Sequence, residues 1–179
     1  MKNVIKEIFS TILYILVVLA GTWLLITFVG QRTSVSGSSM EPTLHHEDQL
    51  ILDKLSYRFS DPKRFDIIVF PFQYQEKTYY VKRIIGLPGE TVQIDAAGNI
   101  YIDGRILEED YGMEPIVFPG LASEPVTLGE DEYFVLGDNR NNSSDSRDPS
   151  VGNIRRKNIV GKAWVRIWPL DKFGLLKHQ

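Results

Sequence analysis

The sequence predicts a mainly β protein, in which one antiparallel, barrel-like β-domain follows a single N-terminal transmembrane helix. Two observations carry this prediction. No charged residue interrupts the 23 positions from Ile8 to Gly30, and a helix of this length crosses roughly 30 Å of hydrocarbon. After Arg32 the chain breaks into short β-branched and aromatic runs separated by turn residues, a pattern typical of all-β sandwiches and barrels.

The apolar N-terminal segment has two alternative interpretations. A cleavable export signal has an apolar core of only about 7–15 residues, followed by a small-residue cleavage site that this chain matches poorly. A buried core helix is uncommon when every side is apolar in so small a domain. We therefore expect an uncleaved, single-pass anchor over residues 1–30. Lys2 and Lys6 precede the span and Arg32 follows it, so the positive-inside rule predicts a cytoplasmic N-terminus and an extracytoplasmic domain over residues 31–179.

Local patterns predict the strands of the β-domain. The turn at Ala97-Gly98-Asn99 is expected to join two of them into a hairpin. Segment 105–130 contains three prolines and is expected to be mostly loop, within a small subdomain that covers roughly residues 90–130. The predicted strands are, in chain order, Gln49–Asp53, Asp66–Pro71, Thr78–Ile85, Thr91–Asp95, Ile100–Asp103, Glu132–Leu136 and Ile159–Trp168.

Composition excludes several classes of function. The chain has 20 basic and 23 acidic residues, and its net charge of -3 gives no reason to expect nucleic acid as a partner. It contains no cysteine, which excludes disulfides, thiol nucleophiles and cysteine-based zinc sites. Only three histidines are present, and His45 and His46 are adjacent, so we expect no histidine metal site.

A serine-rich segment follows the anchor. Four serines crowd positions 34–39, with Gly37 among them. A nucleophilic serine needs an exposed Oγ and a backbone that can approach the substrate carbonyl, and a turn of small residues supplies both. Taken alone, however, this pattern more often describes a flexible linker.

The predicted strand over Thr78–Ile85 carries two adjacent cations. Alternation places Lys82 on one face and Arg83 on the other, so one of them faces inward if one face is buried. Arginine stays protonated, whereas a lysine in apolar surroundings can lose its proton and act as a base. The alternative is an edge-strand charge that protects the sheet.

A third segment, from Leu136 to Pro149, is dense in side chains that stabilise irregular backbone by hydrogen bonding. A calcium loop is one alternative. Arg140 occupies a position where an EF-hand places a ligand, and the required glycine and final glutamate are missing. A plain surface loop is the other alternative.

Taken together, in this order and after an N-terminal anchor, the three segments resemble the sequence boxes of bacterial type I signal peptidases (leader peptidases) in their short single-span form. The family pattern S-x-x-S-M-x-P-T-L matches Ser36–Leu44, and Y-V-K-R-x-x-G-x-P-G-E matches Tyr80–Glu90. The pattern G-D-N-x-x-x-S-x-D-S-R matches Gly137–Arg147. Arg64–Phe70 resembles a further family strand, with Phe65 where glycine is common. Four matches in the right order are a much stronger signal than any one of them.

The resemblance implies roles for single residues. The family's nucleophile falls on Ser39, its general base on Lys82, and the serine that supports this lysine on Ser143. Gly37 stands where some relatives carry an oxyanion-hole serine. The oxyanion is therefore expected to depend on backbone N–H groups, including that of Ser39, with the Ser38 hydroxyl as a further candidate. The structural residues of the site fall on Asp138, Asp145 and Arg147.

The resemblance also implies the activity of a membrane-anchored serine endopeptidase that removes signal peptides from exported preproteins without a cofactor. The expected partners are these preproteins and membrane lipid, and the secretion translocon is a further candidate. Exposed apolar side chains near Val35 and near Phe72 or Tyr74 are expected to rest on the lipid. Shallow pockets for small substrate side chains are expected to be lined by Val35, Met40, Leu44, Tyr80 and Val81.

Three alternatives compete with this interpretation. A self-cleaving repressor-type protease shares the Ser–Lys dyad, but the anchor and the lack of a DNA-binding segment argue against it. A noncatalytic membrane-anchored β-domain adaptor is the alternative outside the enzymes, and intact Ser39 and Lys82 argue against that. A Ser–His enzyme using His45 or His46 fits poorly, because these histidines are too close in sequence to the serine to come from an opposing wall.

Overall fold

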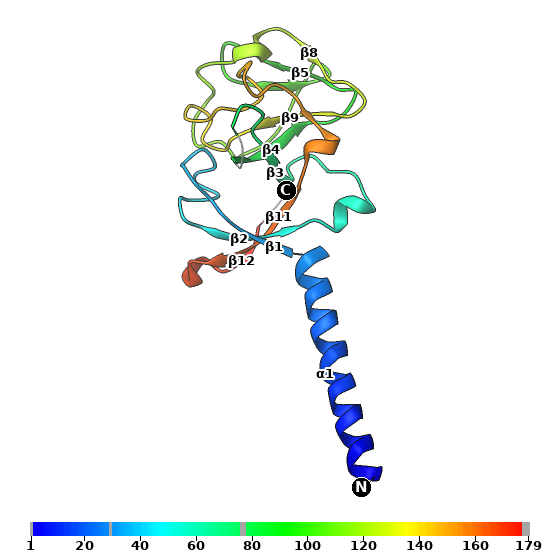
Figure 1. The fold of residues 1–179 in the computed structure, drawn as a ribbon. Helices are drawn as coiled ribbons and strands as arrows, with labels where there is room; N and C mark the ends of the chain where they lie inside the picture. Colours follow the sequence, from blue (N-terminus) through cyan, green and yellow to red (C-terminus); the bar gives the residue numbers. More distant parts are fainter. Residues whose placement is uncertain (1, 29, 76–77, 177–179) are drawn as a thin grey trace.

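The computed structural model describes residues 2–28, 30–75 and 78–176. It confirms the predicted mainly antiparallel β fold with one N-terminal apolar helix. This helix, α1 (Lys2–Phe28), extends away from the strands in Figure 1. Its window Lys6–Trp23 has a mean hydropathy of 1.4 and is 0% buried. By length and composition, α1 can therefore cross a membrane.

The junction between helix and strands differs from the prediction. The apolar stretch was expected to run to Gly30, but Gly30 opens strand β1 (Gly30–Ser34). β1 pairs with β2 (Gln49–Asp53) in a register that runs from Gly30↔Asp53 to Ser34↔Gln49. The β1 sequence, GQRTS, has no apolar alternation. Its pairing partner, rather than a local pattern, makes it a strand, and for that reason sequence patterns did not predict it.

The larger sheet has eight strands, and their order is β1-β2-β11-β3-β4-β9-β10, with β12 paired to β11. All of its pairings are antiparallel. Among the described residues β1 and β10 lie at opposite ends of this order and do not pair, so the barrel-like sheet is not closed. The remaining strands are β3 (Ile67–Pro71), β4 (Tyr79–Gly86), β9 (Glu132–Leu136), β10 (Ile154–Arg155), β11 (Gly161–Trp168) and β12 (Gly174–Leu175).

A second sheet has the order β7-β6-β5-β8. Figure 1 shows β5 and β8 at the end of the molecule far from α1. The predicted hairpin is confirmed, since Ile94 pairs with Ile100 across the turn. Gly98 has a φ of 87°, and a Cβ there would lie 2.7 Å from the backbone of Ile116, so this turn requires glycine. The strands are β5 (Thr91–Ile94), β6 (Ile100–Ile102), β7 (Arg105–Ile106) and β8 (Val126–Thr127).

Four short 3₁₀ helices complete the elements of the described chain. They are η1 (Ser56–Arg58), η2 (Gly120–Ser123), η3 (Arg156–Asn158) and η4 (Leu170–Lys172).

Both faces of the larger sheet are covered near its centre. Ile67 and Val69 of β3 pack into one apolar cluster, and Ile68 packs into another. Because side chains alternate along a strand, the two clusters lie on opposite faces. The sequence predicted one inward-facing cation on β4 on the premise of a single buried face. With both faces covered, Lys82 is 3% exposed and Arg83 is 0% exposed.

Candidate active site

Ser39 lies on a tight turn that is anchored by backbone hydrogen bonds and by two buried side chains. The Glu41 amide donates to the Ser38 carbonyl over 3.1 Å, and the Leu44 amide donates to the Met40 carbonyl over 2.9 Å. The side chains of Met40 and Leu44 are fully buried. These two anchors fix the turn, while Ser39 stays partly exposed.

Lys82 comes to this turn from β4, where it pairs with Ile68 of β3. Its Nζ lies 2.7 Å from Ser39 Oγ. The structure therefore brings together the two side chains that the sequence predicted as nucleophile and base. When the amine is neutral, the Ser39 hydroxyl can donate its proton directly to Nζ, which is the geometry needed for nucleophilic attack.

The environment of Lys82 makes its neutral form easier to reach than that of a lysine in water. Burial lowers the pKa of Lys82 from 10.5 to about 8. The charges of Asp145 and Asp138 act in the opposite direction and raise this pKa, whereas the charge of Arg147 lowers it. Desolvation outweighs the attraction of the carboxylates, because removing an ammonium group from water penalises its charged form.

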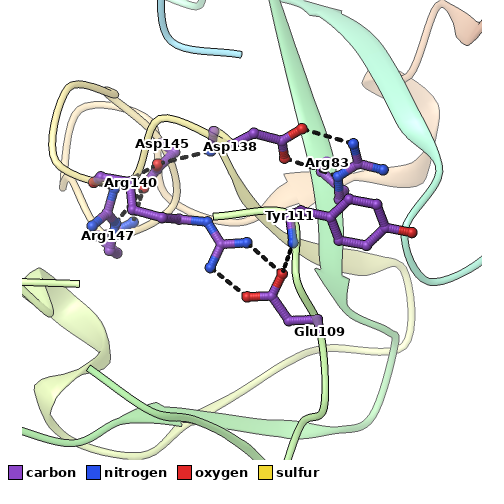
Figure 2. A network of polar contacts seen from close by, with 8 residues as sticks. Arg83, Glu109, Tyr111, Asp138, Arg140, Asp145 and Arg147 are labelled. Carbon is purple, nitrogen blue, oxygen red and sulfur yellow. Dashed lines mark hydrogen bonds and ion pairs between the residues drawn. The ribbon is translucent and has the colours of Figure 1, made fainter. Parts of the chain in front are cut away.

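Both nearby carboxylates are already paired with arginines. Figure 2 shows Asp138 facing Arg83, whose Nε and Nη2 donate to its two oxygens over 2.8 and 2.7 Å. The guanidinium of Arg83 also lies 3.5 Å from the ring centroid of Tyr111. Asp145 is paired in the same two-pronged way with Arg147, over 2.8 Å each. These pairs satisfy the buried carboxylates without using the lysine.

The same network holds the loop between β9 and β10. The Gly137 amide donates to Asp145 over 3.0 Å, and Arg147 Nη2 donates to the carbonyl of Arg140 over 2.6 Å. Arg140 in turn donates to both oxygens of Glu109 over 2.7 and 2.8 Å (Figure 2). Sequence reasoning did not identify Glu109, because no local pattern marks a carboxylate whose partner lies 31 residues away.

Ser143 packs against the turn that carries the nucleophile. A Cβ added to Gly137 would lie 2.3 Å from Ser143 Oγ and 2.4 Å from the Ser39 carbonyl oxygen. The absence of a side chain at Gly137 therefore leaves the space in which Ser143 approaches this turn. Within the described residues, Ser143 Oγ is buried without a hydrogen-bond partner. The predicted support of the lysine by Ser143 stays a prediction.

Two asparagines tie the turn to the β9–β10 loop. The Asn139 amide donates to the Ser39 carbonyl over 3.1 Å, and its side chain donates to the Ser38 carbonyl over 3.2 Å. Asn142 Nδ2 donates to Ser38 Oγ over 3.0 Å. Sequence reasoning missed the role of both asparagines, although each lies inside the third box.

Ser39 and Lys82 line a groove of about 580 Å³. The structure does not place Leu44 there. Its side chain is 0% exposed, packs in a core cluster with Leu50 and Leu52, and is not among the residues that line the groove. Four of the five predicted pocket residues line the groove, namely Val35, Met40, Tyr80 and Val81.

The described residues contain no group of three or more metal-ligating side chains.

Comparison with known proteins gives the family. Residues 5–168 match the family model described as signal peptidase, peptidase S26. Probable signal peptidase I-2 of Synechocystis sp. is 44% identical over 155 residues, which cover 84% of this chain and 68% of the relative. Signal peptidase I of Leptolyngbya laminosa is 43% identical over 157 residues, or 84% and 74% of the two chains. Signal peptidase I P of Bacillus subtilis subsp. natto is 36% identical over 175 residues, which cover 93% of this chain and 92% of the relative.

The fold is mainly β, and Ser39 and the buried Lys82 both line its groove. The match over most of the chain makes the assignment: the chain belongs to the peptidase S26 family of signal peptidases.

Proposed function

We propose that this protein is a membrane-anchored serine endopeptidase that removes signal peptides from exported preproteins, with Ser39 as nucleophile and Lys82 as general base. The observation that carries the proposal is the distance of 2.7 Å between Ser39 Oγ and Lys82 Nζ, together with the burial of the amine. The family and the names of its relatives support the substrate class.

In the first half of the reaction, neutral Lys82 takes the hydroxyl proton of Ser39 while Oγ attacks the carbonyl carbon of the peptide bond. The ammonium then gives this proton to the departing amine as the C–N bond breaks, which leaves an acyl-enzyme ester. In the second half, a water molecule gives a proton to the neutral amine of Lys82 and attacks the ester carbonyl carbon. The proton returns to Oγ, and the cleaved signal peptide leaves with a new carboxylate.

The negative charge that develops on the carbonyl oxygen needs hydrogen-bond donors. Among the described residues, the Ser39 amide has no hydrogen-bond partner and faces no competition for this role. The Ser38 hydroxyl accepts a bond from Asn142. Its own proton therefore remains to be donated, and we assign it as the second donor.

The walls of the groove suit an extended peptide. β1 is the end strand of its sheet, and Tyr79–Lys82 of β4 precede the stretch that pairs with β9. Both segments therefore have an edge without a strand partner in the described chain, and residues from both line the groove. A substrate strand can add to such edges by main-chain hydrogen bonding. Tyr80 and Val81 are partly exposed and can then contact substrate side chains, whereas Val35 and Met40 line the groove but are buried.

The membrane brings substrate and enzyme together. We propose that α1 spans the bilayer with its N-terminus in the cytoplasm, so that the catalytic domain lies outside beside the apolar segment of the signal peptide. Of the side chains expected to rest on the lipid, Tyr74 is 71% exposed, whereas Val35 itself is only 5% exposed. Large exposed apolar side chains also lie along β11, η4 and β12, on Trp168, Leu170, Phe173 and Leu175.

The direct test is cleavage of a purified preprotein by the full chain in detergent. Ser39→Ala and Lys82→Ala should each lower kcat/KM by about a thousandfold or more, and the double variant should be little worse than either, because the two groups act as a unit. Lys157→Ala removes an exposed lysine of η3 and is the matched control. Near-normal turnover by Lys82→Ala would refute the dyad, and an inactive wild-type chain would favour the adaptor alternative.

A further inference from the structure

The backbone just before the nucleophile is held by a histidine side chain. Beyond β1, the Val35 amide donates to the Asp48 carbonyl over 2.9 Å, and the Glu47 amide donates to the Val35 carbonyl over 2.9 Å. At the next step the Gly37 amide donates to Nδ1 of His46 over 3.2 Å. The backbone hydrogen bonds between residues 35 and 47–48 thus end at a contact in which a ring nitrogen, not a backbone carbonyl, accepts the bond.

Gly37 depends on such a contact more than most residues. It has no side chain to anchor it, and its φ of 95° is a conformation that favours glycine. It lies two residues before Ser39 and forms part of the groove wall. An acceptor at Nδ1 requires a neutral imidazole whose proton is on Nε2.

We propose that His46 is a positioning residue for the reaction: by holding the Gly37 amide, it fixes the groove wall and the direction of the Ser39 amide. This inference rests on the proposed function. It also removes the Gly37 amide from the set of oxyanion donors, because that N–H is already engaged. The Ser39 amide and the Ser38 hydroxyl remain, and Asn142 donates a hydrogen bond to the latter.

His46 is exposed, so its substitution does not open a core cavity. The neighbouring His45, which is only partly exposed, offers a control for loss of an imidazole, because its buried Nδ1 has no hydrogen-bond partner among the described residues. Two substitutions separate the acceptor from the bulk of the ring. In His46→Asn the side-chain oxygen can occupy the place of Nδ1, whereas His46→Leu keeps the size but has no acceptor.

The test measures kcat and KM of the full chain in detergent with a peptide substrate. His46→Leu should lower kcat about fivefold, the factor expected for one ordinary hydrogen bond, with KM within about twofold. His46→Asn and His45→Leu should both stay within about twofold of wild type for kcat. A wild-type kcat for His46→Leu would overturn the proposal. An equal loss of kcat in His46→Leu and His46→Asn would also overturn it.

A second measurement does not depend on activity and separates this inference from the proposed function. Hydrogen exchange of the Gly37 amide should be roughly tenfold faster in His46→Leu than in wild type, and close to wild type in His46→Asn. Equal exchange rates of the Gly37 amide in all three proteins would show that His46 does not hold this amide. A wild-type chain without peptidase activity would refute the proposed function, and the exchange data would still decide whether His46 holds Gly37.

Discussion

Lys82 and Arg83 are consecutive on β4 and both buried, but within the described chain only Arg83 is paired with a carboxylate. Arg83 takes both oxygens of Asp138, while Lys82 Nζ lies 2.7 Å from the Ser39 hydroxyl. Arg147 occupies Asp145 in the same way. Burial is the largest cause of the lowered pKa of Lys82, and the charge of Arg147 adds to it against the two carboxylates, which raise the pKa. A buried amine with no carboxylate paired to it among the described residues is the physical basis of the predicted base.

Activity should therefore rise with pH through about 8, the value to which burial lowers the pKa of Lys82. The protonated amine cannot accept a proton, so kcat/KM should fall about tenfold per pH unit well below that value and level off above it. The measurement is the pH profile of kcat/KM with a peptide that has no group titrating in this range. If the rising limb of this profile had its midpoint near 10.5, the ordinary pKa of lysine, the lowered pKa of Lys82 would be refuted.

Substitutions in the Asp145–Arg147 pair should move this limb in opposite directions. Asp145 raises the pKa of Lys82 and Arg147 lowers it. Asp145→Asn should therefore shift the limb to lower pH, and Arg147→Gln should shift it to higher pH. Each variant leaves a buried charge without its partner and is expected to lose about 3–5 kcal/mol of stability. Thermal unfolding should accompany each profile, and shifts of the same sign would contradict the electrostatic account.

Gly137→Ala should abolish most of the activity by displacing the nucleophile. The new Cβ would lie 2.3 Å from Ser143 Oγ and 2.4 Å from the Ser39 carbonyl oxygen, so one of these groups must move. Displacements of about 1 Å at a reacting group can cost about a hundredfold in rate. Gly174→Ala is the control, because a Cβ there meets nothing within 4 Å. Normal turnover by Gly137→Ala would show that this packing does not position Ser39.

The exposed apolar side chains of β11, η4 and β12 should matter only when a bilayer is present. Replacing Trp168 and Phe173 with serine should lower cleavage of a preprotein in phospholipid vesicles about tenfold, because the domain loses apolar surface that can enter the interface. Cleavage of a short soluble peptide in detergent should not change. Phe59→Ser, at a residue that is 83% exposed beside η1, is the control. Equal effects on both substrates would argue against lipid contact.

Sequence by itself determined the elements whose information is local. Apolar runs bounded by turn residues predicted β2 and β9 at their observed bounds, and the family boxes selected Ser39 and Lys82. The long apolar segment predicted α1, although not where it gives way to β1. Patterns of this kind work because alternation and turn chemistry are properties of neighbouring residues.

Only the tertiary structure decided how distant residues meet. The sheet covers both faces of β4, so Lys82 and Arg83 are both buried. Leu44 belongs to the core instead of the groove, and the pairing of Glu109 with Arg140 depends on the meeting of two loops. The contact of His46 with Gly37 arises in the same way, where a ladder ends. Burial and partner choice depend on what packs against a residue, and the residue's own sequence neighbourhood does not contain that information.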